Sequence, residues 1–97
     1  MRIRLAAKAQ IQLQQIQAYL AARNPDAARR VVAEIVKGIE GVSHQPYAAR
    51  RTDYADVRVL TITRYPYLVF YRVDEPLNEI QVLRIRHGAR NPARHLD

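Results

Sequence analysis

Apolar residues recur along the first half of the chain at the spacing of an α-helix. After Ala6, a stripe with intervals of four, three and four residues contains Ala9, Leu13, Ile16 and Leu20. A second stripe contains Ala28, Val32, Ile35, Ile39 and Val42, with Val31 beside it. Residues three or four positions apart lie on the same helical face, so each stripe predicts a helix with one buried side.

The boundary between the two predicted helices lies at Asn24. Its side chain can cap the second helix, Pro25 suits the first helical position, and Asp26 complements the positive end of the helix dipole. Gly41 is a plausible C-terminal stop for this helix. The connection is so short that the two helices are expected to form an antiparallel hairpin.

Four other segments have the composition and alternation of β-strands. They are residues 2–5, residues 56–63, Tyr67–Val73 and Glu79–Ile85, with a turn between the last two at residues 74–78. Short links between the last three strands favour an antiparallel meander. The predicted fold is therefore α+β with the order β-α-α-β-β-β, a helical hairpin packed on a small antiparallel sheet, and residues 1–97 form one domain.

The charge of the chain indicates an anionic partner. Lys and Arg number 16 against 9 Asp and Glu, which gives a net charge of +7, and only Lys8 and Lys37 are lysines. Arginine favours forked contacts with carboxylate or phosphate groups. Positive side chains are concentrated after the last predicted strand, which makes a candidate target-binding set of Arg84, Arg86, His87, Arg90 and Arg94.

Several kinds of site are disfavoured by composition. The chain has no cysteine, which excludes disulfides, thiolate metal sites and a cysteine nucleophile. His44, His87 and His95 lack the spacing of metal ligands, so no metal or cofactor is expected. No apolar run approaches the roughly 20 residues of a membrane span, and no secretion signal is visible, so we expect a cytoplasmic protein without membrane contact.

Aromatic residues gather at the predicted hairpin, where Tyr65, Tyr67, Phe70 and Tyr71 lie close together in sequence. They could stack on a nucleobase, or they could pack within the sheet. Strand alternation favours packing, because it puts Tyr67, Val69, Tyr71 and Val73 on one face. The opposite face would carry Leu68, Phe70 and Arg72.

Several sequence features, in this order and spacing, resemble the ParE/RelE superfamily of toxins from bacterial toxin–antitoxin systems. They are the order of elements, the NPDAA boundary at residues 24–28, VRVL at 57–60, YPYLVFYRV at 65–73, and LRIRHGAR at 83–90. The resemblance covers nearly the whole chain and is greatest to the ParE branch, which includes plasmid-stabilisation and addiction-module toxins.

The resemblance implies a specific function. ParE-like toxins inhibit DNA gyrase and are held inactive by a cognate ParD-like antitoxin in a toxin–antitoxin hetero-oligomer. Residues expected to contact such an antitoxin are Arg58, Leu68, Phe70 and Arg72. The RelE branch shares the fold but cleaves messenger RNA on the ribosome, and this is the alternative function, with the ribosome and its mRNA as partners.

The resemblance also indicates where a RelE-type nuclease would hold its catalytic groups. A catalytic arginine position falls on Leu68, and the second falls near Gly88, with Arg86 and Arg90 on either side. If the protein were a nuclease of this type, Arg86 and His87 would be its candidate catalytic residues, because some RelE relatives use a histidine near this point. A lysine pair falls near Val59 and Thr61, and a C-terminal tyrosine falls near Arg94 and His95. Leucine cannot stabilise the charge that develops on a phosphorane, so Leu68 favours an inhibitory binding protein over an enzyme.

Overall fold

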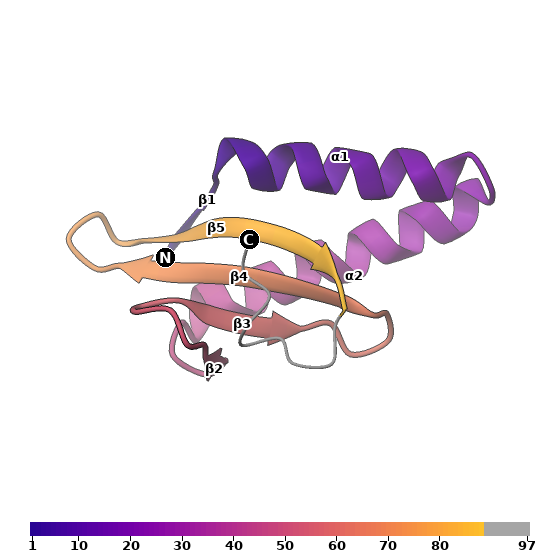
Figure 1. Ribbon diagram of the computed structural model, residues 1–97. Helices are drawn as coiled ribbons and strands as arrows, with labels where there is room; N and C mark the ends of the chain where they lie inside the picture. Colours follow the sequence, from indigo (N-terminus) through magenta and orange to yellow (C-terminus); the bar gives the residue numbers. More distant parts are fainter. Residues whose placement is uncertain (89–97) are drawn as a thin grey trace.

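Two helices lie against one face of a five-stranded sheet (Figure 1) in the computed structural model, which describes residues 1–88. The elements in chain order are β1 (Arg2–Leu5), α1 (Ala7–Ala21), α2 (Pro25–His44), β2 (Arg50–Arg51), β3 (Arg58–Thr61), β4 (Tyr67–Asp74) and β5 (Glu79–His87). The predicted helical hairpin and strand meander are confirmed. The two-residue strand β2 was not predicted, since its two arginines carry no apolar alternation.

The sheet has the order β1-β5-β4-β3-β2, so the first strand of the chain lies beside the last. β1 pairs with β5 in parallel, while the other neighbours are antiparallel. The sheet is therefore mixed, which corrects the expected antiparallel sheet. The helical hairpin connects β1 to the meander, and this long connection allows a parallel pair that a tight turn could not make.

The start of α2 is built as the sequence predicts, but its end is not. The Asn24 side chain accepts a hydrogen bond from the backbone N–H of Ala27 at 3.1 Å, with Pro25 and Asp26 in the first turn. The helix passes through Gly41 and ends only at His44. Continuing the helix buries Val42 in the core, and this burial outweighs the low helix propensity of glycine.

Both faces of the sheet carry buried apolar residues. The larger cluster lies under the helices and contains Ile35, Ile39, Val69, Tyr71, Ile80, Val82 and Ile85 among its members. A smaller cluster on the opposite face, called the outer face below, contains Val57, Val59, Leu68 and Phe70, with Leu83 packed against it. Packing is therefore the role of Tyr67, Phe70 and Tyr71, whose side chains are buried too deeply to stack on a base.

A β-bulge in β5 decides which of its side chains face the helices. Arg84 lies opposite Phe70 and Val82 lies opposite Tyr71, so Leu83 is an extra residue with no partner of its own. The bulge shifts the alternation by one position. Val82 and Ile85 both enter the core under the helices, and Arg84 and Arg86 both lie on the outer face.

Tyr71 connects the buried sheet to the loop that follows α2. Its hydroxyl donates a hydrogen bond to the carbonyl oxygen of Pro46 at 2.7 Å. Arg58 holds the same loop by donating to the carbonyl oxygens of Tyr47 at 3.1 Å and Ala49 at 2.8 Å. Burial raises the pKa of Tyr71, while the neighbouring charge of Arg58 acts in the opposite direction.

Tyr71→Phe is expected to lower the free energy of unfolding by about 1 kcal/mol at neutral pH, because one hydrogen bond is lost. The native state holds the tyrosine proton more tightly than the unfolded chain, where the pKa is about 10. The wild type therefore loses stability as the pH rises above that value, and the phenylalanine variant lacks this loss. Urea denaturation at several pH values measures the difference, which should shrink at alkaline pH. Tyr54→Phe, at an exposed position, should change little.

Candidate functional site

Arg84 and Arg86 lie two positions apart on the outer face of the sheet. They pair across to Phe70 and Leu68 of β4, and both arginines are half-buried. The Arg84 side chain folds back so that one terminal nitrogen donates to the carbonyl oxygen of Leu83 at 2.7 Å, and its Nε has no hydrogen-bond partner among residues 1–88. This Nε is buried and is not open to a partner, so binding of a carboxylate or phosphate would depend on the rest of the guanidinium group, which favours forked contacts with such anions.

His87 lies on the other face of the same strand. Its ring meets the edge of the Tyr67 ring with 5.4 Å between centroids and an interplanar angle of 83°. The cationic ending is therefore divided, with two arginines on the outer face and the histidine on the helix side. Arg90 and Arg94, the other predicted target-binding residues, lie outside the described residues, as does His95.

A groove of about 860 Å³ runs between α1 and the end of β5. Its walls include Gln12, Ile16, Tyr19 and Leu20 from the helix, Tyr65–Tyr67 from the turn, and Ile85–His87 from the strand. Burial raises the pKa of Tyr67, so this phenol stays protonated near neutral pH and offers no phenolate base. Gln12 was not recognised from sequence, because nothing distinguishes it from the four other glutamines of the same helix.

Two of the residues expected to contact an antitoxin have structural partners. Arg58 is bound to the loop carbonyl groups of Tyr47 and Ala49, and its guanidinium lies 5.2 Å from the centre of the Tyr47 ring. Arg72 is exposed on the outer face and donates to Gln81 at 2.8 Å. Of the two, Arg72 is the more accessible to a partner protein.

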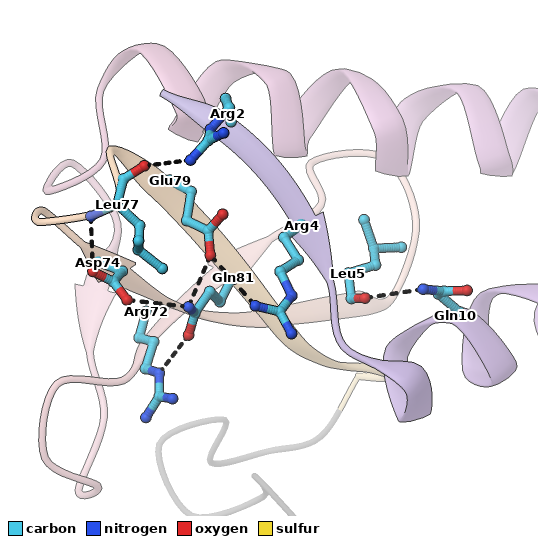
Figure 2. A network of polar contacts seen from close by, with 9 residues as sticks. All are labelled: Arg2, Arg4, Leu5, Gln10, Arg72, Asp74, Leu77, Glu79 and Gln81. Atoms are coloured by element: carbon cyan, nitrogen blue, oxygen red, sulfur yellow. Dashed lines mark hydrogen bonds and ion pairs between the residues drawn. The ribbon is translucent and has the colours of Figure 1, made fainter.

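Figure 2 shows the polar network to which Arg72 belongs. The amide nitrogen of Gln81 donates to Asp74 at 3.3 Å and to Glu79 at 3.0 Å, and Arg4 of β1 lies 3.7 Å from Glu79. The network links three strands, β4, β5 and β1, at the end of β5 remote from Arg84 and Arg86. Its arginines are balanced by carboxylates, so the unbalanced positive charge of β5 lies at the strand's other end.

The outer face is more fully packed than a bare docking surface. Leu68 and Phe70 are exposed by only 3% and 0%, so neither side chain is available for direct contact with an antitoxin in this arrangement. Their predicted role in antitoxin binding stays a prediction, and it would act through the residues that they support. An arginine at position 68 in the same orientation would enter the apolar cluster of Val57, Val59 and Phe70.

Gly88 stands where the RelE pattern would put a second arginine. Its backbone N–H donates to the carbonyl oxygen of Pro66, and a Cβ atom built here would approach that oxygen to 2.8 Å. The two backbones approach so closely here that a side chain would not fit, which explains why residue 88 is a glycine. It fixes the end of β5 against the Tyr65–Tyr67 turn, beside the groove.

The described residues hold neither a metal-binding cluster nor a membrane-spanning helix. Among residues 1–88, no three histidine, aspartate or glutamate side chains gather closely enough to hold a metal ion. Within the same residues, neither helix has both the length and the apolar character needed to cross a membrane.

The chain is similar to known toxins over most of its length. Residues 3–92 match the family described as ParE toxin of type II toxin-antitoxin system, parDE. The chain is 31% identical over 87 residues to "Putative toxin Y4kP" of Sinorhizobium fredii, covering 90% of this chain and 88% of that protein.

Solved structures show the same fold. A chain of the "Chromosomal ParDE TA system from P. aeruginosa" is 28% identical, with a TM-score of 0.79 over 92% of this chain and 97% of that one. A chain of the RelBE2 toxin–antitoxin complex of Mycobacterium tuberculosis, at 19% identity and a TM-score of 0.65 over 89% and 95% of the two chains, shares the fold. The predicted resemblance is confirmed: the chain belongs to the ParE toxin family of type II toxin–antitoxin systems.

Proposed function

We propose that the protein inhibits bacterial DNA gyrase by binding it, and that a cognate ParD-like antitoxin neutralises it in a hetero-oligomer. The observation that carries the proposal is the pair Arg84 and Arg86 on the outer face, beside a buried leucine at position 68. The face offers positive charge for binding an acidic surface. It lacks, among residues 1–88, a guanidinium at the position where a RelE-type nuclease would hold one. We expect the toxin to act in the cytoplasm, where gyrase meets DNA.

Binding is favoured over cleavage by what RNA hydrolysis requires. A nuclease without a metal needs a base for the 2′-hydroxyl, cations around the developing phosphorane charge, and an acid for the leaving oxygen. Losing one preorganised contact to the transition-state charge costs about 2.7–4 kcal/mol. Leu68 and Gly88 both lack such a group, and burial moves the pKa of Tyr67 further above the neutral range, away from that of a useful base.

The alternative is a ribosome-dependent endoribonuclease of the RelE type. One observation supports it: Arg86 and His87 belong to opposite faces of β5, yet both line the groove beside α1, so this end of the strand could present a cation and an imidazole to RNA. This alternative predicts codon-biased cuts in messenger RNA on translating ribosomes. If the toxin arrested growth and left the transcripts intact, the endoribonuclease alternative would be ruled out.

The direct test is a supercoiling assay with purified gyrase. We expect the wild-type protein to inhibit supercoiling and the cognate antitoxin to restore it. Unimpaired supercoiling at saturating toxin would contradict the proposal.

Arg86→Ala is expected to weaken gyrase inhibition by about tenfold or more, because arginines at the centre of an interface commonly supply over 1.4 kcal/mol of binding free energy. The half-inhibitory concentration in the supercoiling assay measures the effect. Arg30→Ala on exposed α2 is the matched control, since it removes the same charge away from this face. Equal losses in both variants would show that total charge matters and the Arg84–Arg86 surface does not. Thermal denaturation of both variants should resemble that of the wild type.

A further inference from the structure

Strand pairing puts a third arginine, Arg50 of β2, on the outer face. Arg50 pairs with Val59, a member of the outer-face cluster, and residues that pair across a sheet direct their side chains to the same face. One row of paired residues across β5, β4, β3 and β2 therefore contains Arg84, Phe70, Val59 and Arg50. At the usual spacing between strands, the Cα atoms of Arg84 and Arg50 lie roughly 14 Å apart. The outer-face cluster thus has positive charge on both sides.

These arginines are not balanced by neighbouring carboxylates. Among residues 1–88, the side chains of Arg50 and Arg86 take part in no hydrogen bond or ion pair. Arg84 uses one terminal nitrogen on a backbone carbonyl, and its other terminal nitrogen has no partner in the same part of the chain. Asp74 and Glu79 share the outer face, but they pair with each other at the other end of β4 and β5.

The groups that this part of the outer face exposes are those that bind phosphate. The centre of a protein–protein interface usually has apolar or aromatic anchors, with charged groups around them. Here Val59, Leu68 and Phe70 are buried in the cluster instead, and Leu83 is half-buried. The accessible groups are guanidinium groups and the hydroxyl of Thr61, which is exposed beside Leu68. Arginine and threonine side chains are common donors to the phosphate oxygens of nucleic acids.

Burial also favours a duplex over a single strand. Proteins hold single strands with aromatic rings on which the bases stack. Within the strands of residues 1–88, Phe70 is the one aromatic residue that the register puts on the outer face, and it is fully buried. The phosphates of duplex DNA border a major groove about 12 Å wide. This width is comparable with the roughly 14 Å between Arg50 and Arg84.

We propose that the outer face binds the phosphate backbone of duplex DNA through Arg50, Arg84 and Arg86. One DNA strand meets the two arginines of β5, and the other meets Arg50. Contacts to phosphate carry no sequence information, so the face does not select a base sequence. The inference rests on the proposed function in one respect, that the DNA met by the toxin is the segment that gyrase holds.

Fluorescence anisotropy of a short labelled duplex, measured over a range of salt concentrations, tests the proposal. Three phosphate contacts give a slope of about −2.7 for the logarithm of the association constant against the logarithm of salt, so the affinity should fall about fortyfold between 50 and 200 mM. Two duplexes of unrelated sequence should bind equally, and single-stranded DNA or RNA of the same length should bind more weakly. Tighter binding of either single strand, or no binding at low salt, would overturn the proposal.

Arg50→Ala is the most informative variant, because Arg50 is remote from the two arginines of β5. Loss of one phosphate contact should reduce the slope by about 0.9, so the affinity would fall only about twelvefold over the same salt range. Arg50→Lys keeps the charge and should keep the slope. Arg30→Ala removes the same charge from exposed α2 and should also leave the slope unchanged. Equal changes in Arg50→Ala and Arg30→Ala would mean that DNA responds to net charge alone, and the outer face would not be the binding site.

The supercoiling assay separates this inference from the proposed function. If the protein inhibits gyrase but its affinity for DNA does not depend on Arg50, Arg84 and Arg86, only the DNA-binding face is wrong, and these arginines meet an acidic protein surface instead. If the face binds DNA but gyrase is unaffected, the DNA-binding face stands and the gyrase proposal falls. If both proposals are right, Arg50→Ala raises the half-inhibitory concentration, and Arg30→Ala does not.

Discussion

Ile85→Arg is expected to leave the protein largely unfolded. Ile85 is only 1% exposed and packs in the cluster under the helices. The substitution removes a buried aliphatic side chain, at a cost of about 2–5 kcal/mol, and it brings an unpaired charge into an apolar site, which costs several more. Small domains are stable by only about 5–15 kcal/mol, so these losses together approach or exceed the total.

This experiment also tests the β-bulge at Leu83. A regular strand would put Ile85 on the face opposite Val82, where an arginine would be tolerated. Circular dichroism and urea denaturation distinguish the two outcomes. Arg84→Ile is the control on the outer face, and it should retain a cooperative unfolding transition. Wild-type stability of Ile85→Arg would mean that β5 has no bulge.

Phe70→Ala is expected to lower the free energy of unfolding by about 3–5 kcal/mol. Phe70 is fully buried at the centre of the outer-face cluster, and its removal loses apolar burial and leaves a cavity. In a domain of this length, such a loss lowers Tm by roughly 15 °C or more. Calorimetry or urea denaturation measures the effect. Leu77→Ala, in the β4–β5 turn at 47% exposure, should change stability far less.

The Phe70 variant separates two roles for the outer face. A residue that only contacts the antitoxin would change the affinity of the complex and leave the free toxin as stable as the wild type. Substitution of a residue that packs within the outer face instead lowers the stability of the free toxin, even when no antitoxin is present. Unchanged stability of Phe70→Ala would show that the second cluster contributes little to folding and would return Phe70 to the candidate contact residues.

The two experiments address a common feature, a sheet that is apolar on both sides. The helices cover one side, and a smaller cluster fills part of the other, leaving Arg84 and Arg86 beside it. Apolar neighbours reduce the solvation of these guanidinium groups, which strengthens their attraction to an anionic partner. The packing that stabilises the outer face therefore also supports the surface proposed to bind gyrase.

The sequence by itself determined the family and every helix and strand except the two-residue strand β2. Helical stripes, the Asn24–Pro25–Asp26 boundary and alternation in β4 are local properties, so they could be read without the fold. The leucine at position 68 and the cationic ending were equally visible. What the sequence misjudged was the end of α2: the prediction put a stop at Gly41, although Val42 continues the apolar stripe and its burial in the core keeps the helix intact as far as His44.

Only the tertiary structure decided how these parts meet. The bulge at Leu83 decides that Arg84 and Arg86 lie on the outer face and His87 on the helix side, whereas a regular strand would reverse these faces. The parallel pairing of β1 covers half of the β5 edge, and Gln12 reaches the uncovered half. Strand register and neighbour order are set by contacts between distant residues, and a one-residue shift reverses every side chain, so local pattern cannot fix them.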